Sequence, residues 1–188
     1  MIIITFISPY LKRMRLHFSS GLTWIELTVV IALIAIITAL ATPSFAIFKA
    51  EQEKKDSMHL IKIAVSHAKQ ATQLYHHDVL LCPSQNGRDC LNKNTWQHGL
   101  LLVEDRNKNR QADATEQRLY FFAQDLQYGT LTWQGSLHKN LIVFQSDTGL
   151  PRGYIGSFKY CHHQQENHSY RMTLSMMGHL RQDANSRC

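Results

Sequence analysis

The stretch that decides the fold is SSGLTWIELTVVIALIAIITALATPSF, residues 19–45, which places Glu26 at the start of a long uncharged run. That run extends from Leu27 to Phe48 and ends at Lys49. As an α-helix it would extend about 33 Å, at roughly 1.5 Å per residue. The hydrocarbon core of a bilayer is about 30 Å thick. The sequence therefore predicts a membrane-spanning helix over residues 22–48.

The charges on the two sides of this run predict its orientation. Lys12, Arg13 and Arg15 precede it, whereas residues 49–56 carry bases and acids in equal number. A basic flank is retained on the cytoplasmic side of a membrane. We therefore expect a single-pass protein whose C-terminal part lies outside the cytoplasm.

A secretory signal peptide is the alternative interpretation of the same residues. The small residues Ala39 and Ala41 satisfy a cleavage rule that would release a chain beginning at Thr42. This alternative leaves Glu26 unexplained, because a carboxylate at a membrane boundary is costly unless another group pairs with it. Cleavage after Gly21 would supply that group, a free α-amine one helical turn before Glu26.

Residues 21–45 resemble the leader junction and helix of type IV pilins and type II secretion pseudopilins, in which Gly, Phe, Thr and Leu precede Ile-Glu-Leu. The resemblance implies that a prepilin peptidase removes the leader after Gly21 and that Leu22 is then N-methylated. It also implies that Glu26 neutralises the N-terminal amine of a neighbouring subunit. Two buried opposite charges are tolerable together where either alone is not.

The leader itself leaves the translation start open. Residues 14–21 form a complete short basic leader, so Met14 is an alternative to Met1 as the first residue. Leu22 and Trp24 depart from the usual phenylalanine and leucine, whereas the pair of Gly21 and Glu26 is intact.

Beyond the uncharged run, the helix is expected to continue as an amphipathic segment over residues 49–77. Met58, Ile61, Val65 and Ala68 recur at helical spacing and predict one buried stripe. Pro43 removes a backbone hydrogen bond, so a bend or local melting is expected there. Pilins share a proline at this place.

Residues 78–188 change to short aliphatic and aromatic runs separated by turn residues such as Asn86-Gly87 and Asp147-Thr148-Gly149. This pattern predicts an antiparallel β-domain packed on the second half of one long helix. The fold class is therefore α+β, and the resemblance to pilins implies the type IV pilin fold.

Four segments of this β-domain narrow the resemblance to the GspH/FimT family of minor pilins. In order they are VLLCPSQNGRDC from residue 79, the stretch over residues 95–122, IVFQSDTGLPRG from residue 142 and YRMTLSMMGHLR from residue 170. The resemblance implies a low-abundance subunit near the filament tip that helps to initiate a type IV pilus or a type II secretion pseudopilus. It also implies other pilins as partners and an inner-membrane location with the β-domain in the periplasm.

DNA is a further candidate partner, because some FimT-type members bind DNA through a C-terminal Gly-Arg-x-Arg motif. Here Gly178 and Arg181 match that motif, and His179 replaces its first arginine. Arg171 and Arg187 are expected to extend the basic surface. The alternative is a solvated strand edge, where basic residues guard against unwanted strand pairing.

The four cysteines, Cys82, Cys90, Cys161 and Cys188, lie in the part expected outside the cytoplasm, where disulfides are the rule. Three pairings are open from sequence alone. We favour Cys82 with Cys90, which closes a short loop, and Cys161 with Cys188, which ties down the C-terminal tail.

One loop has the ligand spacing of a calcium site. Its oxygen-bearing residues stand at positions 1, 3, 5, 9 and 12 of that pattern and are Asp105, Asn107, Asn109, Asp113 and Glu116. Arg110 occupies the sixth position, where the pattern requires glycine. The alternative is an exposed hairpin loop whose Asn and Asp residues favour turns. No other cofactor is expected.

No enzyme motif is present in the sequence, neither a glycine-rich phosphate loop nor a nucleophile elbow nor a zinc-protease helix. The formal net charge is +6 for 20 bases and 14 acids. Without Lys12, Arg13 and Arg15 it falls to 17 − 14 = +3. This small excess is weak support for nucleic acid as a partner. The chain is expected to be a substrate of the prepilin peptidase and its methyltransferase activity rather than an enzyme.

Overall fold

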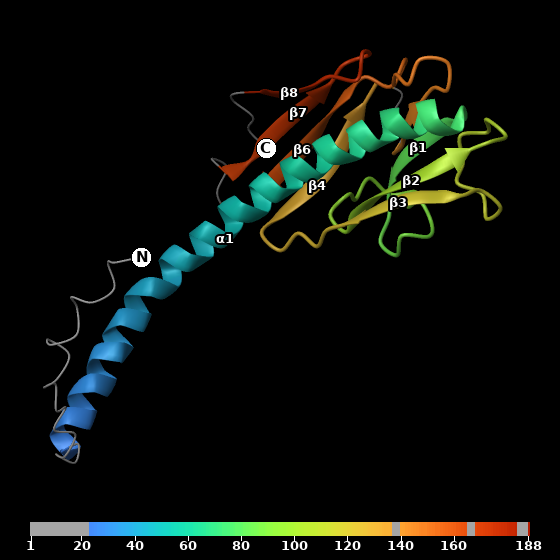
Figure 1. The fold of residues 1–188 in the computed structure, drawn as a ribbon. Helices are drawn as coiled ribbons and strands as arrows, with labels where there is room; N and C mark the ends of the chain where they lie inside the picture. The colour runs from blue at the N-terminus through green and yellow to red at the C-terminus, as the bar shows by residue number, and fades with distance from the viewer. Residues whose placement is uncertain (1–22, 137–139, 165–167, 184–187) are drawn as a thin grey trace, which may run out of the picture. The chain divides into compact units, whose positions relative to one another are not determined.

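The computed structural model describes residues 23–136, 140–164, 168–183 and 188. The chain divides into two compact units between Ser44 and Phe45. Helix α1 (Trp24–Tyr75) contributes residues to both units, and the second unit adds eight strands (Figure 1). The predicted leader junction, Gly21 and Leu22, lies outside the described residues.

Thr23 caps the start of helix α1. Its hydroxyl oxygen accepts a hydrogen bond from the Glu26 backbone N–H at 3.4 Å, and its carbonyl accepts from the same N–H at 3.0 Å and from that of Leu27 at 3.2 Å. A threonine followed three residues later by glutamate has the spacing of a capping box. The negative charge of Glu26 also suits the positive end of the helix dipole.

The first half of α1 passes through residue 43 as continuous helix, so the local melting expected at Pro43 is not observed. The division into two units falls directly after this proline. In the described part of the chain, no helix is both long enough and apolar enough to cross a membrane. The side chains of residues 40–44 are outside the description.

In the second unit, α1 buries one stripe. The buried residues recur every three or four positions, which is the period of one helix face, and are Ile61, Ala64, Val65, Ala68 and Ala71. The helix ends at Tyr75, and His76 then adopts a positive φ of 57° while its N–H donates to the Thr72 carbonyl at 3.0 Å. This left-handed residue ends the helix and turns the chain into β1.

Eight strands form two four-stranded sheets in which every pairing is antiparallel. The first has the order β3-β2-β1-β5 and the second the order β4-β6-β7-β8. The strands are β1 (Asp78–Pro83), β2 (Gly99–Asp105), β3 (Arg118–Ala123), β4 (Gly129–Gly135), β5 (Ile142–Phe144), β6 (Gly156–His162), β7 (Tyr170–Leu174) and β8 (Leu180–Asp183). The predicted α+β class is confirmed. The division into two sheets and strand β8 were not predicted.

The edge of strand β4 is covered by the segment that precedes β2. The side-chain amide of Asn94 donates to the Trp133 carbonyl at 2.6 Å and accepts from the Trp133 N–H at 2.8 Å. The Trp96 N–H donates to the Leu131 carbonyl at 3.0 Å. An asparagine side chain thus takes the place of a neighbouring strand, which protects this edge from pairing with another chain.

One hydrophobic core joins helix α1 to both sheets. Around Phe158, the ring of Trp96 packs edge to face at 5.2 Å and that of Trp133 tilts at 4.7 Å. Tyr160 stacks on Tyr170 at 5.2 Å. Aromatic pairs at these distances stabilise a core beyond their burial alone.

Polar contacts of Glu53, which precedes this buried stripe, attach helix α1 to the second sheet and to the segment before strand β4. The Glu53 carboxylate accepts hydrogen bonds from the Tyr160 hydroxyl at 2.7 Å and from the N–H groups of Gln127 at 2.6 Å and Tyr128 at 3.1 Å. Burial, with the Glu53 hydrogen bond, raises the pKa of Tyr160. The tyrosine therefore remains a hydrogen-bond donor to Glu53 at all physiological pH values.

Candidate assembly surface and loop sites

The first half of helix α1 is apolar around its whole circumference and none of its described side chains is buried. Many large apolar side chains are exposed in its described residues: Trp24, Ile25, Leu27, Val29, Val30, Ile31, Leu33, Ile34, Ile36 and Ile37, and then Phe45, Ile47 and Phe48. A helix that is hydrophobic all round needs apolar surroundings on every side, and exposed patches of this size mark interaction surfaces.

The few polar side chains of this helical half are satisfied within the helix. The Thr28 hydroxyl donates to the Ile25 carbonyl at 2.8 Å, and the Thr38 hydroxyl lies 2.9 Å from the Ile34 carbonyl and 3.0 Å from that of Ala35. A hydroxyl bonded to its own helix tolerates apolar surroundings, because its donor needs no water. These hydroxyl groups would therefore stay paired if other apolar side chains covered the helix.

Glu26 is the only charged residue of α1 before Lys49. Its side chain is exposed in the first helical turn, beside the capping residue Thr23. Its negative charge lies at the positive end of the helix dipole.

The predicted DNA-binding residues lie on the β7–β8 hairpin. Gly178 occupies its turn with φ of 67°, a left-handed conformation that favours glycine, and a Cβ there would contact the end of the Lys69 side chain. His179 and Arg181 are exposed, and the Arg181 side chain is 83% accessible. Its guanidinium lies 3.5 Å from the Asp183 carboxylate.

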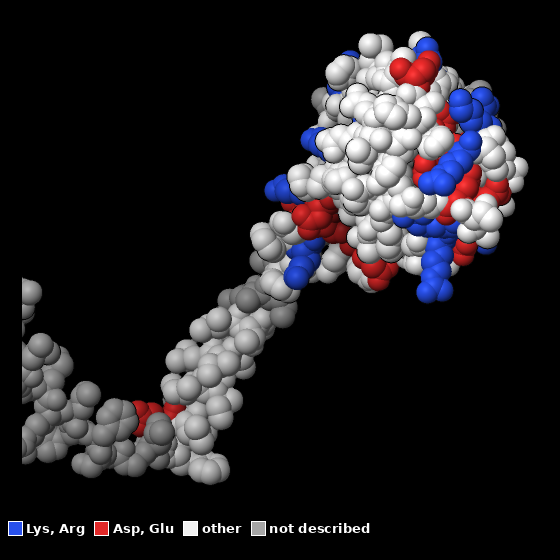
Figure 2. Space-filling view, turned by 45° about the vertical axis from the view of Figure 1, so that its right-hand side comes forward, with Lys and Arg blue, Asp and Glu red and all other residues white. Residues whose placement is uncertain are grey.

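Arg171 lies in the middle of the second sheet, level with Lys159 on β6 and Asp183 on β8. The Lys159 ammonium donates to the Cys188 carbonyl at 3.2 Å. Arg187 is outside the described residues. The structure therefore brings Arg171 and Arg181 onto neighbouring strands but places an acid beside them, and Figure 2 shows basic and acidic side chains interspersed on the face that it presents.

The oxygen atoms of the candidate calcium loop accept hydrogen bonds from the loop itself. Asp105 accepts from the N–H groups of Asn109 at 3.1 Å and Arg110 at 3.0 Å. Asp113 accepts from the amide nitrogens of Asn107 at 2.8 Å and Asn109 at 2.7 Å. Burial raises the pKa of Asp105, with these N–H groups opposing the rise.

Glu116 completes this arrangement. It is buried and accepts from the N–H groups of Arg106 at 3.2 Å and Asp113 at 3.1 Å. Within the described ranges, no group of three or more His, Cys, Asp or Glu side chains is placed to hold a metal ion. The pattern therefore describes a loop closed by its own hydrogen bonds, as the turn interpretation expected.

Two disulfides join the cysteines in the pairing that the sequence favoured. Cys82 is linked to Cys90 with a Cα–Cα distance of 5.6 Å, and Cys161 to Cys188 with 5.8 Å. Cys82 is buried in the core, whereas Cys188 is exposed. The first disulfide therefore anchors a loop to strand β1, and the second holds the C-terminal residue on strand β6.

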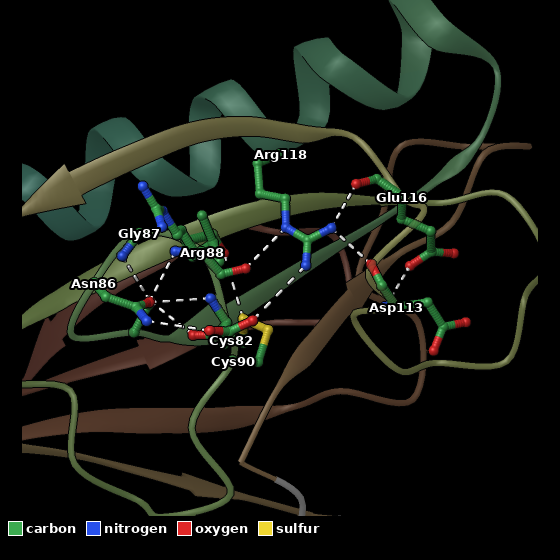
Figure 3. Close-up of a disulfide and its surroundings, with 11 residues drawn as sticks. Cys82, Asn86, Gly87, Arg88, Cys90, Asp113, Glu116 and Arg118 are labelled. Carbon is green, nitrogen blue, oxygen red and sulfur yellow. Dashed lines mark hydrogen bonds and ion pairs between the residues drawn. A yellow bond between two sulfur atoms is a disulfide. The ribbon is translucent and has the colours of Figure 1, made fainter.

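Arg118 connects two loops, a role that the sequence did not reveal. One is the disulfide loop, residues 84–98 between β1 and β2, which contains Cys90 of the Cys82–Cys90 disulfide, and the other is the β2–β3 loop. The Arg118 guanidinium donates to the carbonyls of Arg88 at 2.8 Å, Asp113 at 2.6 Å and Glu116 at 2.6 Å (Figure 3). All three acceptors are backbone atoms, so no side-chain pattern in the sequence could have indicated them. The two loops are thereby held together over strand β3.

Comparisons with known proteins place this architecture in a family. The sequence profile of the family described as Type II transport protein GspH matches residues 61–178. A comparison with curated proteins finds no match. Among solved structures, the chain is similar to the type IV minor pilin FimU of Pseudomonas aeruginosa strain PAO1, in two crystal forms and at 11% sequence identity in each.

The P65 form has a TM-score of 0.43 and the match covers 72% of this chain and 90% of that chain. The P21 form has a TM-score of 0.46, with 76% of this chain and 91% of that chain covered. The family match carries the assignment, because it spans more than half of the chain and most of both sheets. The chain therefore belongs to the family of the type II transport protein GspH, which is a family of minor pilins and pseudopilins.

Proposed function

We propose that the chain is a low-abundance subunit near the tip of a type IV pilus or type II secretion pseudopilus and that it helps to initiate assembly. One observation carries the proposal. The first half of α1 exposes apolar side chains on all sides, while the unit from Phe45 onward buries its own core. Such a helix is stable only among other apolar groups, and helices of partner pilins provide them.

Before assembly, the same helix lies in the inner membrane in this proposal, with the second unit in the periplasm. The uncharged sequence from Leu27 to Phe48 and the internally bonded threonines support this location. A prepilin peptidase removes the leader after Gly21, and N-methylation follows at Leu22. Glu26 then neutralises the N-terminal amine of a neighbouring subunit.

The Glu26 pairing is tested by filament incorporation. Glu26→Ala and Glu26→Gln are expected to be processed normally and to be absent from purified filaments, because the partner's amine would be buried without a counter-charge. Asp56→Asn is a matched control, since Asp56 is an exposed carboxylate on the second half of the same helix. Normal incorporation of both Glu26 variants would contradict the mechanism.

Intact mass of the mature chain distinguishes pilin processing from ordinary secretion. A chain beginning at Leu22 with one added methyl group supports the proposal. A chain beginning at Thr42 would instead establish a cleaved signal peptide and remove the helix on which assembly depends.

DNA uptake is the second candidate function, favoured by the exposure of Arg181 beside Gly178 and His179. The test is binding of duplex DNA across a salt series, beside a triple alanine variant of Arg171, Arg181 and Arg187. Phosphate contacts would give an affinity that falls with salt and is lost in the variant. Asp183 lies beside two of these residues, so Asp183→Asn is expected to strengthen any such binding. Equal binding by wild type and triple variant would exclude this surface.

A further inference from the structure

A cavity of about 640 Å³ opens between the disulfide loop and the β2–β3 loop. The Cys82–Cys90 disulfide forms part of its wall, and polar side chains of both loops line it together with Asn140. The Asn140 amide donates to the Asn92 carbonyl at 2.7 Å and joins a third segment to this wall. Arg118 binds both loops through their backbone carbonyls (Figure 3). The cavity therefore has a wall fixed by a disulfide and by hydrogen bonds.

Arg110 is the one positively charged side chain among the described residues that line this cavity. Its φ is 61°, a left-handed conformation that is uncommon for a long side chain. The Asp105 carboxylate holds it there by accepting the N–H groups of Arg110 and Asn109. The Arg110 side chain is exposed and forms no ion pair with any described residue. The loop thus presents an unpaired guanidinium at the cavity.

The charges around the cavity favour an anion. None of the described residues that line it carries a carboxylate. The acids of the two loops are engaged elsewhere, Asp113 and Glu116 with loop N–H groups and Asp89 with Asn86. Two further exposed cations without a described ion pair, Arg88 and Lys93, stand between strands β1 and β2. Among its described lining residues, the cavity therefore has one cation and no acid.

The uncharged lining favours a polypeptide. The side-chain amides of Asn92 and Gln111 are exposed and make no hydrogen bond with described residues. Each amide offers donors and an acceptor, which matches the N–H and C=O of a peptide group. No aromatic side chain is among the described lining residues, so the stacking platforms that bind nucleic-acid bases are missing there.

From this lining we infer that the cavity binds an extended acidic segment of a partner protein. Arg110 receives a carboxylate through its planar fork, and Asn92 and Gln111 bond the neighbouring peptide groups. The inference rests on the proposed assembly function only for the identity of the partner as another filament subunit. Binding itself can be measured on the isolated chain, so its failure is distinguishable from a failure to assemble.

The experiment is a titration of the full mature chain in detergent with a short capped peptide that alternates glutamate and serine. A peptide that alternates glutamine and serine is the neutral control. We expect saturable binding of the acidic peptide, weakened about tenfold or more by Arg110→Gln, because a hydrogen bond to a charged group is lost. Lys108→Gln is the matched control, since Lys108 is an exposed cation of the same loop with a similar φ of 58°.

A second variant, Asn92→Ala, tests the other wall of the cavity and is expected to weaken binding several-fold. Lack of saturable binding at millimolar acidic peptide would overturn the inference, as would equal losses in Arg110→Gln and Lys108→Gln. A single-stranded oligonucleotide forms the last arm. If it binds in an Arg110-dependent manner while the peptide does not, the cavity is a nucleic-acid site and the inference is wrong.

Discussion

The two halves of helix α1 differ both in apolar content and in surroundings. Ile37, in the first half, is 65% exposed, whereas Ile61, in the second half, is fully buried. The second half has one apolar stripe, which the two sheets cover, and a polar opposite face. The first half has no polar face at all. Apolar residues arranged as a stripe serve the fold of the chain itself, and apolar residues on all sides serve contacts with other molecules.

The sharpest test of this comparison is a large-to-small substitution in each region. Phe158→Ala is expected to lower the free energy of unfolding of the second unit by about 3–5 kcal/mol, because Phe158 is fully buried between Trp96 and Trp133. Ile37→Ala is expected to change the same quantity by less than about 0.5 kcal/mol and to reduce filament incorporation. Urea unfolding followed by tryptophan fluorescence measures the free energy of unfolding of both variants, and the amount of each variant in purified filaments measures incorporation. A large loss in Ile37→Ala would mean that the first half of α1 belongs to the folding core.

The disulfides give the next largest effect and compare two regions of the second unit. Replacing Cys161 and Cys188 by alanine is expected to cost about 3–4 kcal/mol and replacing Cys82 and Cys90 about 2–3 kcal/mol. The reason is that the closed loops differ in length, with sequence separations of 27 and 8. The reverse order in urea unfolding would show that the packing around buried Cys82 outweighs chain entropy.

Glu53 tests the polar attachment between α1 and the second sheet. Glu53→Gln is expected to lower the free energy of unfolding by about 1.5–3 kcal/mol, because one carboxylate accepts from Gln127, Tyr128 and Tyr160. Asp56→Asn, one turn further along the helix, is the control and is expected to have little effect. Equal effects of the two variants would show that the helix is held by its apolar stripe alone.

The smallest expected effect concerns pH. Burial, and then the neighbouring His168, lowers the pKa of His162 below its ordinary value of 6.5. The native state therefore binds fewer protons than the unfolded state, so stability is retained above pH 6.5 and declines as the pH falls below it. His162→Gln is expected to flatten this decline in a series of thermal unfolding midpoints between pH 7 and pH 5. His179→Gln, in the exposed β7–β8 turn, should retain the wild-type decline.

The sequence predicted the local features of the fold because these depend on nearby residues. The helical spacing of Ile61, Val65 and Ala68 and the short aliphatic and aromatic runs of the strands are visible along the chain. The position of strand β8 was missed, because Leu180–Asp183 contains three polar residues and pairs only with β7. The assignment of strands to the two sheets was not predicted either. Strand β5, for example, pairs with β1 although more than fifty residues separate them in the sequence.

In the candidate sites, too, the residue pattern was visible in the sequence, and the contacts of those residues were not. The spacing of Asp105, Asn107 and Asn109 suggested metal ligands, whereas the structure turns those oxygens toward N–H groups of the loop. The structure places Gly178 and Arg181 on an exposed hairpin, and their acidic neighbour Asp183 was not anticipated from the sequence. The Arg118 contacts and the Arg110 cavity were not foreseen either.

The sequence by itself determined the family, through the match over residues 61–178, and the apolar character of the first half of α1, through the uncharged run from Leu27 to Phe48. Only the tertiary structure decided which polar groups meet. Glu53 reaches Tyr160, and Arg118 reaches Arg88 and Glu116, through hydrogen bonds between segments far apart in the chain or to backbone carbonyls. Hydrogen bonds depend on distances of about 3 Å, and such distances are set by the folded backbone rather than by the order of residues.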